Sequence, residues 1–208
     1  MLNILIADDH SIVRSGLKIL IGKDYTANVE EASNGKEITD RLKEKNFELA
    51  ILDINMPDTN SPQLVEYVRI NYPKTKILIF SMHPEQMYAK RYLKMGVNGY
   101  LSKEATDAET RKAIQSVLSG KRYISSKVSE LLMDDALHKS KENPFDNLSS
   151  REFEVASLLI KGKALNEITN ILHVHSSTIG THKAHIFEKL NVSNVIELNE
   201  LAKLYGLE

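Results

Sequence analysis

The chain has 208 residues, which at about 150 residues per domain suggests one large domain or two small ones. Its 42% hydrophobic and 26% charged residues exclude a disordered polymer, and the absence of cysteine excludes disulfide frameworks, thiolate metal sites and cysteine nucleophiles. The net charge of −1 gives no whole-chain argument for a nucleic acid or a membrane surface as partner. Because long apolar runs and a basic leader are missing, we expect a cytoplasmic protein without a membrane span.

Short apolar runs alternate with amphipathic segments through residues 2–120. Strands are expected at 2–7, in the 25–32 region, and at 49–52, 76–81 and 99–102. Helices are expected at 11–22, 35–46 and 85–95, with one more opened by Pro62 and another from Thr106 to near Gly120. Five such units predict an α/β fold, a five-stranded doubly wound parallel sheet with helices on both faces. Ligands of such sheets bind beyond the carboxyl ends of the strands.

Five polar side chains fall at those strand ends. Asp8 and Asp9 end the first strand, Asp53 the third and Ser81 the fourth, and Lys103 follows the fifth. Carboxylates this close repel one another, and Mg²⁺ is the usual neutralising ion where a phosphate completes its shell. Lysine then supplies a positive charge to phosphate oxygens, and a carboxylate can act as the nucleophile. Taken singly, each residue fits a strand-end cap or a solvated loop. Together they predict phosphorylation of an aspartate.

The segments IADDH, LDINMP, FSMH and GYLSK, in this order, resemble the receiver domain of bacterial response regulators over residues 1–122. The resemblance implies a flavodoxin-like fold in which Asp53 accepts a phosphoryl group from a histidine kinase. It further implies that Mg²⁺ is held by Asp8, Asp9, Asp53 and the carbonyl of Asn55, and that Ser81 and Lys103 contact the phosphoryl group. Ser81 and Tyr100 would form the switch, the phosphate pulling Ser81 while Tyr100 moves inward.

Three features near these motifs modify the expectation. Ser61 stands where the family very often has glycine, and the following Pro62 is unusual there. The sequence therefore does not determine the conformation of this loop. Asn55 and His83 border the expected phosphoryl site and are candidates for tuning hydrolysis of the phosphoryl group.

An aspartate-nucleophile phosphatase is an alternative function, but that class places a second acid where this chain has Asn55. We therefore do not expect an enzyme.

A change of pattern after the receiver-like region predicts a linker over residues 123–146. Apolar residues at helical spacing indicate one amphipathic helix within it, carrying Val128, Leu131, Leu132, Ala136 and Leu137. Residues 138–143 are polar, and Pro144 then interrupts the chain. Strand signals do not recur beyond this point, so a second, small all-α domain is expected over residues 147–208.

This second domain has the pattern of a helix-turn-helix. Ser149 and Glu152 form a capping box for a helix that ends near Gly162, and a short helix follows at 165–172. A turn at 173–175 separates it from a third helix, capped by Ser176-Ser177 and running to about residue 190. A last helix spans 194–204. In the third helix, one face is apolar and the other is outward, presenting Gly180, Thr181, Lys183, Ala184 and Glu188.

The segments LSSREFEVASLLIKGK and NEITNILHVHSSTIGTHKAHIFEKLNV are similar to the LuxR-type helix-turn-helix. With the receiver, the chain resembles a response regulator of the NarL/LuxR-type subfamily, a transcription regulator whose phosphorylation controls dimerisation and DNA binding. The resemblance implies a recognition helix over 177–190, contacting double-stranded DNA through Ser177, Thr178, Thr181, His182 and Lys183. Gly180 and Val195 stand where lysine and arginine are common.

The charge of the second domain leaves an alternative open. From Phe145 onward the sequence has six Lys and Arg residues and eight Asp and Glu residues, which gives a net charge of −2. Because phosphate neutralisation supplies most nonspecific affinity for DNA, we expect weak monomeric binding that depends on a two-fold dimer, with half-sites about one helical turn apart. Leu198 and Leu201 are candidates for the dimer surface, and equally for the core. The alternative is a signalling adaptor whose helical domain binds protein.

Overall fold

The computed structural model describes residues 1–137 and 143–207. The chain divides into two compact units, Met1–Met133 and Asp134–Glu208. In the described part of the chain, none of the helices combines the length and the apolar character needed to cross a bilayer. Residues 138–142 of the expected polar tether lie outside the described residues.

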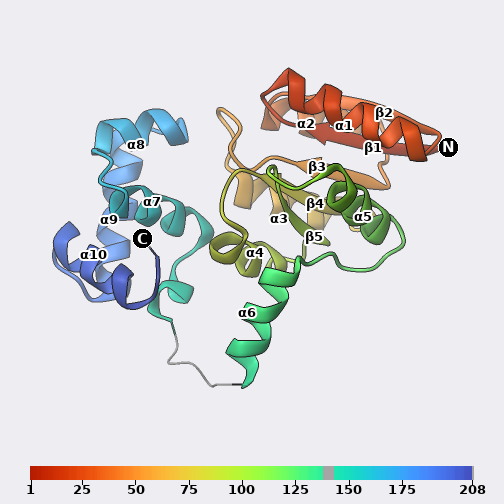
Figure 1. The fold of residues 1–208 in the computed structure, drawn as a ribbon. Helices are drawn as coiled ribbons and strands as arrows, with labels where there is room; N and C mark the ends of the chain where they lie inside the picture. Colours follow the sequence, from red (N-terminus) through yellow and green to blue (C-terminus); the bar gives the residue numbers. More distant parts are fainter. Residues whose placement is uncertain (138–142, 208) are drawn as a thin grey trace. The chain divides into compact units, whose positions relative to one another are not determined.

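The first unit is built on a five-stranded parallel sheet of order β2-β1-β3-β4-β5 (Figure 1). The register pairs Ala7 with Leu52, so the residues that follow them, Asp8 and Asp53, leave the sheet side by side. This arrangement confirms the predicted doubly wound fold. The strands are β1 Leu2–Ala7, β2 Ala27–Ala32, β3 Leu49–Leu52, β4 Lys76–Ser81 and β5 Gly99–Ser102.

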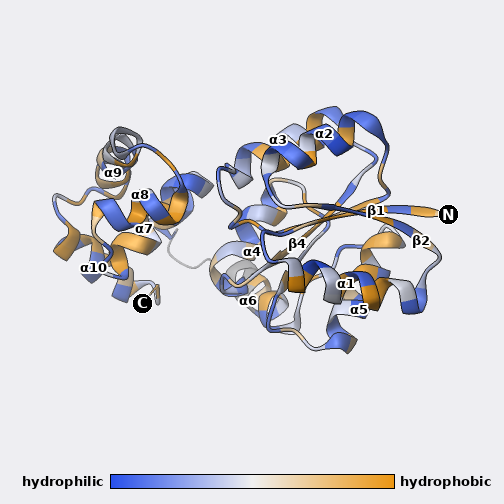
Figure 2. Cartoon of the chain, turned by 90° about the horizontal axis from the view of Figure 1, so that it is seen from above, coloured by the Kyte–Doolittle hydropathy of each residue, from blue (hydrophilic) through white to orange (hydrophobic). Residues whose placement is uncertain are grey.

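Helices cover both faces of this sheet. Figure 2 shows α1 and α5 on one side and α2 and α3 on the other. On the first side, Leu17 of α1 and Ile114 of α5 pack in one core cluster with Ile6 and Ile51 of the sheet. The chain thereby buries the central strands on both faces, which is the normal state of a parallel sheet. The helices are α1 Ser11–Asp24, α2 Gly35–Glu44, α3 Ser61–Asn71, α4 Glu85–Lys94 and α5 Asp107–Leu118.

The loop between β3 and α3 accommodates the unusual Ser61 by a hydrogen bond. Ser61 is buried, and its hydroxyl donates to the carbonyl of Ile54 at 2.5 Å. Asn60 caps the helix by accepting from the Gln63 amide at 3.2 Å, and Pro62 lies in the first turn, where its missing N–H costs little. The two departures from the family pattern are therefore compatible with an ordered loop.

The linker begins along the free edge of β5. Tyr123 forms an isolated parallel bridge with Gly99, and its amide donates to the carbonyl of Asn98 at 2.9 Å. A Cβ atom on Gly99 would lie 3.0 Å from Leu78 Cδ1, 3.1 Å from the Cβ of Tyr123 and 3.2 Å from its carbonyl oxygen, so any side chain here would push these neighbours apart, and glycine allows the close approach. The amphipathic helix expected in the linker follows as α6, Ser126–Leu137.

The second unit is all-helical, with the pattern that the sequence predicts. Phe145 is 1% exposed and its ring centroid lies 6.3 Å from that of Tyr205, so the end of the expected linker packs with this unit. Phe153, Ile168 and Ile186 are also buried in this unit. The elements are the 3-10 helix η1 Pro144–Asn147 and the helices α7 Ser150–Ile160, α8 Leu165–Leu172, α9 Ser176–Leu190 and α10 Val195–Leu204.

One expectation for this unit is wrong, and one alternative that the sequence left open is decided. Ser176 and Ser177 do not cap α9: both lie inside the helix, the N-cap residue is His175, and no side-chain hydrogen bond caps this end among the described residues. Leu198 is fully buried, so it belongs to the core of the unit and offers no dimer surface. Leu201 is only half-buried, while Ile196 on the same helix is 73% exposed.

Glu152 ties the first turn of α7 to α9, and we expect Glu152→Gln to lower the free energy of unfolding at pH 7 by about 1–3 kcal/mol. The buried carboxylate accepts hydrogen bonds from Lys189 Nζ and the Ser149 amide, each at 2.7 Å. Burial opposes its ionisation, but these bonds hold the pKa of Glu152 below its usual value. A carboxylate whose pKa is lowered in the folded state stabilises the fold above its unfolded-state pKa. This stabilisation is lost as the pH falls through the folded-state pKa.

The difference between the wild type and Glu152→Gln should therefore shrink below about pH 4.3, the ordinary value for glutamate. Urea unfolding at pH 7 and at pH 4 measures it. Glu188→Gln, on the exposed side of α9, is the control and should change little at either pH. A Glu152→Gln difference that stays constant over this range contradicts the assignment.

Candidate functional site

Lys103 joins two aspartates at the carboxyl edge of the sheet. Its Nζ lies 2.6 Å from Asp8 Oδ2 and 2.8 Å from Asp53 Oδ2, and the three side chains are between 2% and 8% exposed. They come from the ends of β1, β3 and β5, which are distant in sequence. The parallel sheet brings them together because its strands end at one edge.

Asp9 and Asn55 adjoin this pair of aspartates. The backbone amide of Asn55 donates to Asp53 Oδ1 at 3.1 Å. The side chain of Asp9 is 32% exposed at the rim of the site. The sequence reasoning missed His10, whose Nδ1 lies 2.7 Å from Asp9 Oδ1 and 3.3 Å from Asp8 Oδ1. Asp8, Asp9 and His10 offer ligand atoms within 4.8 Å of one another. The position of His10 directly after two aspartates was the only available signal.

Ser81 and Tyr100 meet at the backbone of His83. The buried Ser81 Oγ accepts from the His83 amide at 3.1 Å, and the Tyr100 hydroxyl donates to the His83 carbonyl at 3.1 Å. The His83 ring stacks on Tyr88 of α4, with centroids 4.6 Å apart. Tyr100 is 1% exposed, and its ring lies inside in this structure, 6.1 Å between centroids from Tyr92 of α4.

Burial and charge act against each other at this site. Burial raises the pKa of Asp53, more than its hydrogen bond with Lys103 lowers it. Burial also disfavours the ammonium, but hydrogen bonds with Asp53 and Asp8 raise the pKa of Lys103. A further positive charge beside the two carboxylates would favour their ionised form. Oxygen ligands in this number suit a hard divalent cation, so the residues present fit Mg²⁺.

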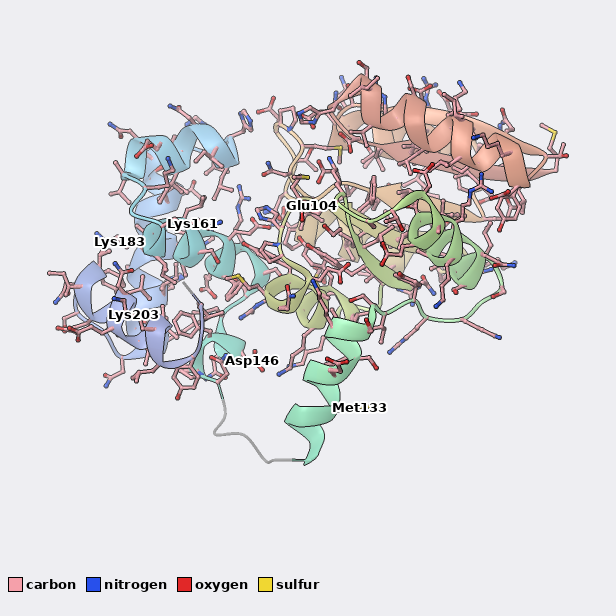
Figure 3. All side chains as sticks on the ribbon, in the orientation of Figure 1. Glu104, Met133, Asp146, Lys161, Lys183 and Lys203 are labelled. Carbon is pink, nitrogen blue, oxygen red and sulfur yellow. The ribbon has the colours of Figure 1, made fainter. Side chains whose placement is uncertain are left out.

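The outer face of α9 carries hydroxyl groups and little charge. Ser177, Thr178 and Thr181 are exposed, whereas Lys183 is half-buried with its Nζ 5.3 Å above the Phe187 ring. Burial and the charge of Arg151 lower the pKa of His182, so this side chain is neutral at pH 7. The lysines labelled in Figure 3 on this unit come from three places: Lys183 from α9, Lys161 from the end of α7 and Lys203 from α10. Two of the six Lys and Arg residues from Phe145 onward, Lys183 and Lys189, lie on α9, so the positive charge of this unit is spread over several elements.

The fold and the polar cluster define the class of protein, a receiver-type α/β unit followed by a helix-turn-helix unit. The family model of the response regulator receiver domain matches residues 4–115, and that of the luxR family of bacterial regulatory proteins matches residues 146–202. The chain therefore belongs to the response regulators of the NarL/LuxR type.

Similar proteins support this assignment over the whole chain. Response regulator UvrY of Escherichia coli K12 is 32% identical over 209 residues, covering 100% of this chain and 96% of its own. Oxygen regulatory protein NreC of Staphylococcus carnosus is 32% identical, covering 97% of this chain and 96% of its own. A solved structure of RcsB from Salmonella enterica serovar Typhimurium, bound to promoter P1flhDC with the phosphomimetic BeF3−, is similar with a TM-score of 0.68. It is 25% identical and covers 96% of this chain and 97% of its own.

Proposed function

We propose that this protein is a cytoplasmic, phosphorylation-dependent transcriptional regulator. Asp53 accepts a phosphoryl group from a histidine kinase: a carboxylate oxygen bonds to phosphorus while the bond from phosphorus to the histidine nitrogen breaks. The observation that carries the proposal is Lys103 Nζ in contact with both Asp8 and Asp53, which places a fixed positive charge beside the nucleophile. It would stabilise the charge that develops on the transferring oxygens.

We assign the Mg²⁺ ligands to Asp8, Asp9, Asp53 and the carbonyl of Asn55. The ion supplies electrostatic stabilisation of the phosphoryl oxygens when it is bound. The protein's own residues do the rest: Lys103 orients and neutralises the phosphoryl group, and the Ser81 hydroxyl, whose oxygen accepts from the His83 amide, would donate its hydrogen to a phosphoryl oxygen. The protein takes up the phosphoryl group itself and turns over no other substrate, which is why we do not class it as an enzyme.

Phosphorylation would shift the receiver conformation and its dimerisation, and so control DNA binding by the helical unit. The candidate contacts to double-stranded DNA lie on the exposed and half-exposed surface of α9, at Ser177, Thr178, Thr181, His182 and Lys183. RcsB, the similar protein named above, is seen on a promoter with a phosphomimetic present. We place the domain boundaries at 1–122 for the receiver, 123–146 for the linker and 147–208 for the DNA-binding domain.

Phosphotransfer from a radiolabelled histidine kinase tests the assignment of Asp53. The wild type should be labelled, and Asp53→Asn should show only background, because the amide oxygen is a poor nucleophile and Lys103 loses one charged partner. Asp58→Asn is the matched control, because Asp58 is an exposed aspartate of the same loop and asparagine tolerates its positive φ of 51°. Equal labelling of Asp53→Asn and Asp58→Asn would overturn the proposal.

The adaptor alternative has support from the net charge of −2 in the helical domain and from Gly180 on its outer face. A gel shift on the protein's own promoter region, with and without a phosphodonor, separates the two functions. Binding that weakens steeply with salt supports the regulator. Absence of salt-sensitive binding in both states favours the adaptor.

A further inference from the structure

Glu85, the first residue of α4, joins the phosphoryl-site edge of the sheet to the linker helix. Its Oε1 accepts from the Ser102 amide at 2.9 Å, and its Oε2 accepts from the Ser125 hydroxyl. Ser102 immediately precedes Lys103, and Ser125 immediately precedes α6. One half-buried carboxylate therefore holds the end of β5 and the start of α6 together.

Both residues expected to contact the phosphoryl group connect to Glu85 through short lengths of backbone. Lys103 is the residue after Ser102, and its amide donates to the carbonyl of Ser81 at 2.9 Å. The His83 amide donates to Ser81 Oγ, and Glu85 follows His83 by two residues. A displacement of Ser81 or Lys103 thus acts on Glu85 from both sides.

On the other side, Ser125 is the N-cap of α6. Its Oγ accepts from the Val128 amide at 3.4 Å, and its carbonyl accepts from the Ser129 amide at 2.9 Å. The same hydroxyl that starts the helix therefore donates to Glu85. Loss of an N-cap hydrogen bond destabilises a helix end, so the geometry of Ser125 matters to the first turn of α6.

There is room for this contact to change. A cleft of about 430 Å³ lies among the start of α4, the loop after β5 and the first turn of α6, and its lining includes Glu85, Ser102, Ser125 and Glu104. Glu104, labelled in Figure 3, is exposed at this cleft. The first turn of α6 therefore borders an open cleft on one side, and it can move toward this cleft without a steric clash.

We propose that Glu85 is a positioning residue that transmits the state of the phosphoryl site to α6. It rests on the proposed function, because it needs Ser81 and Lys103 to respond to a phosphoryl group at Asp53. When those two residues turn toward the phosphoryl oxygens, the backbone at 83–85 and at 102–103 shifts and the hydrogen bond from Ser125 to Glu85 breaks. The first turn of α6 then loosens, and the segment leading to the helical domain is released from α4.

Hydrogen exchange of the full-length protein, with and without beryllofluoride plus Mg²⁺, tests this link. In the wild type, beryllofluoride should slow exchange at residues 53–55 and speed exchange at residues 126–130 by about three- to tenfold, the effect of losing one hydrogen bond. In Glu85→Ala, exchange at 126–130 should already be fast and should not respond, while residues 53–55 still respond. Ser125→Ala should behave in the same way. Because it leaves α4 unchanged, it is the second variant if Glu85→Ala folds poorly.

Glu104→Ala is the matched control, because it removes a carboxylate from the same cleft and should respond as the wild type does. A purely structural role of Glu85 would change the basal exchange but leave the response to beryllofluoride intact, and that result overturns the inference. So does a wild type in which residues 53–55 respond and residues 126–130 do not. Failure of the proposed function appears differently, as no response at residues 53–55 of the wild type, and it overturns both.

Discussion

In the Lys103→Met variant, the free energy of unfolding of the first unit is expected to fall by about 3–5 kcal/mol when no divalent cation is added. Methionine keeps much of the length of the side chain but removes its charge. Asp8 and Asp53, whose side chains are 2% and 3% exposed, then face each other without the ammonium that contacts both. A buried charge that loses its partner keeps its desolvation cost, and here two charges lose the same partner.

The same variant should become strongly dependent on Mg²⁺. A divalent cation that binds the folded protein stabilises it by mass action, and the effect grows with its affinity for the two carboxylates. Urea unfolding with and without saturating Mg²⁺ should therefore show a larger gain for Lys103→Met than for the wild type. Lys36→Met, at an exposed position of α2, is the control. A loss of less than about 0.5 kcal/mol, typical of surface substitutions, would show that Lys103 does not neutralise this pair.

Gly180→Lys is expected to strengthen DNA binding and to steepen its salt dependence. Gly180 is exposed on α9, and a Cβ atom built on it would meet no atom of the described residues within 4 Å. A lysine there adds positive charge to a face that has little, and each new phosphate contact steepens the salt slope by about 1. In a dimer, the added lysine of each copy contributes to the change in the salt slope.

Gly180→Ala separates charge from helix propensity. Both substitutions should raise the free energy of unfolding by about 0.5–1 kcal/mol, because glycine is unfavourable within a helix. Only Gly180→Lys should change the salt slope, measured by fluorescence anisotropy on promoter DNA over a range of salt concentrations. If the two variants bind DNA with the same slope, α9 does not face the phosphate backbone. That result would favour the adaptor function.

The sheet and its reactive edge were predictable because they depend on local pattern. Apolar runs marked β1, β3 and β4, whereas β2, with the sequence ANVEEA, was placed by the alternation of strands and helices. The polar residues that follow the strands had to share one edge once the strands were parallel. The contact of Lys103 with Asp8 and Asp53 follows from that topology. The roles of these residues in phosphoryl transfer stay predictions until labelling is measured.

Other features were not predictable because they depend on tertiary contacts. Leu198 and Leu201 are both apolar residues of α10, and spacing alone did not show that Leu198 is fully buried whereas Leu201 is half-buried. Capping depends on backbone angles, so Ser176 and Ser177 matched the preferred residue types although His175 occupies the cap position. The pairing of Glu85 with Ser125 spans 40 residues, and no motif joins them.

The bridge between Tyr123 and Gly99 also determines how the receiver can be cut from the rest of the chain. A strand at the margin of a sheet exposes unpaired amides and carbonyls, which invite pairing with another molecule. Tyr123 occupies part of that margin on β5, while the opposite margin, β2, carries Glu30 and Glu31, whose charges discourage such pairing. A receiver fragment that ends before residue 123 would uncover β5 and tend to self-associate, whereas one that continues through α6 keeps its edge protected.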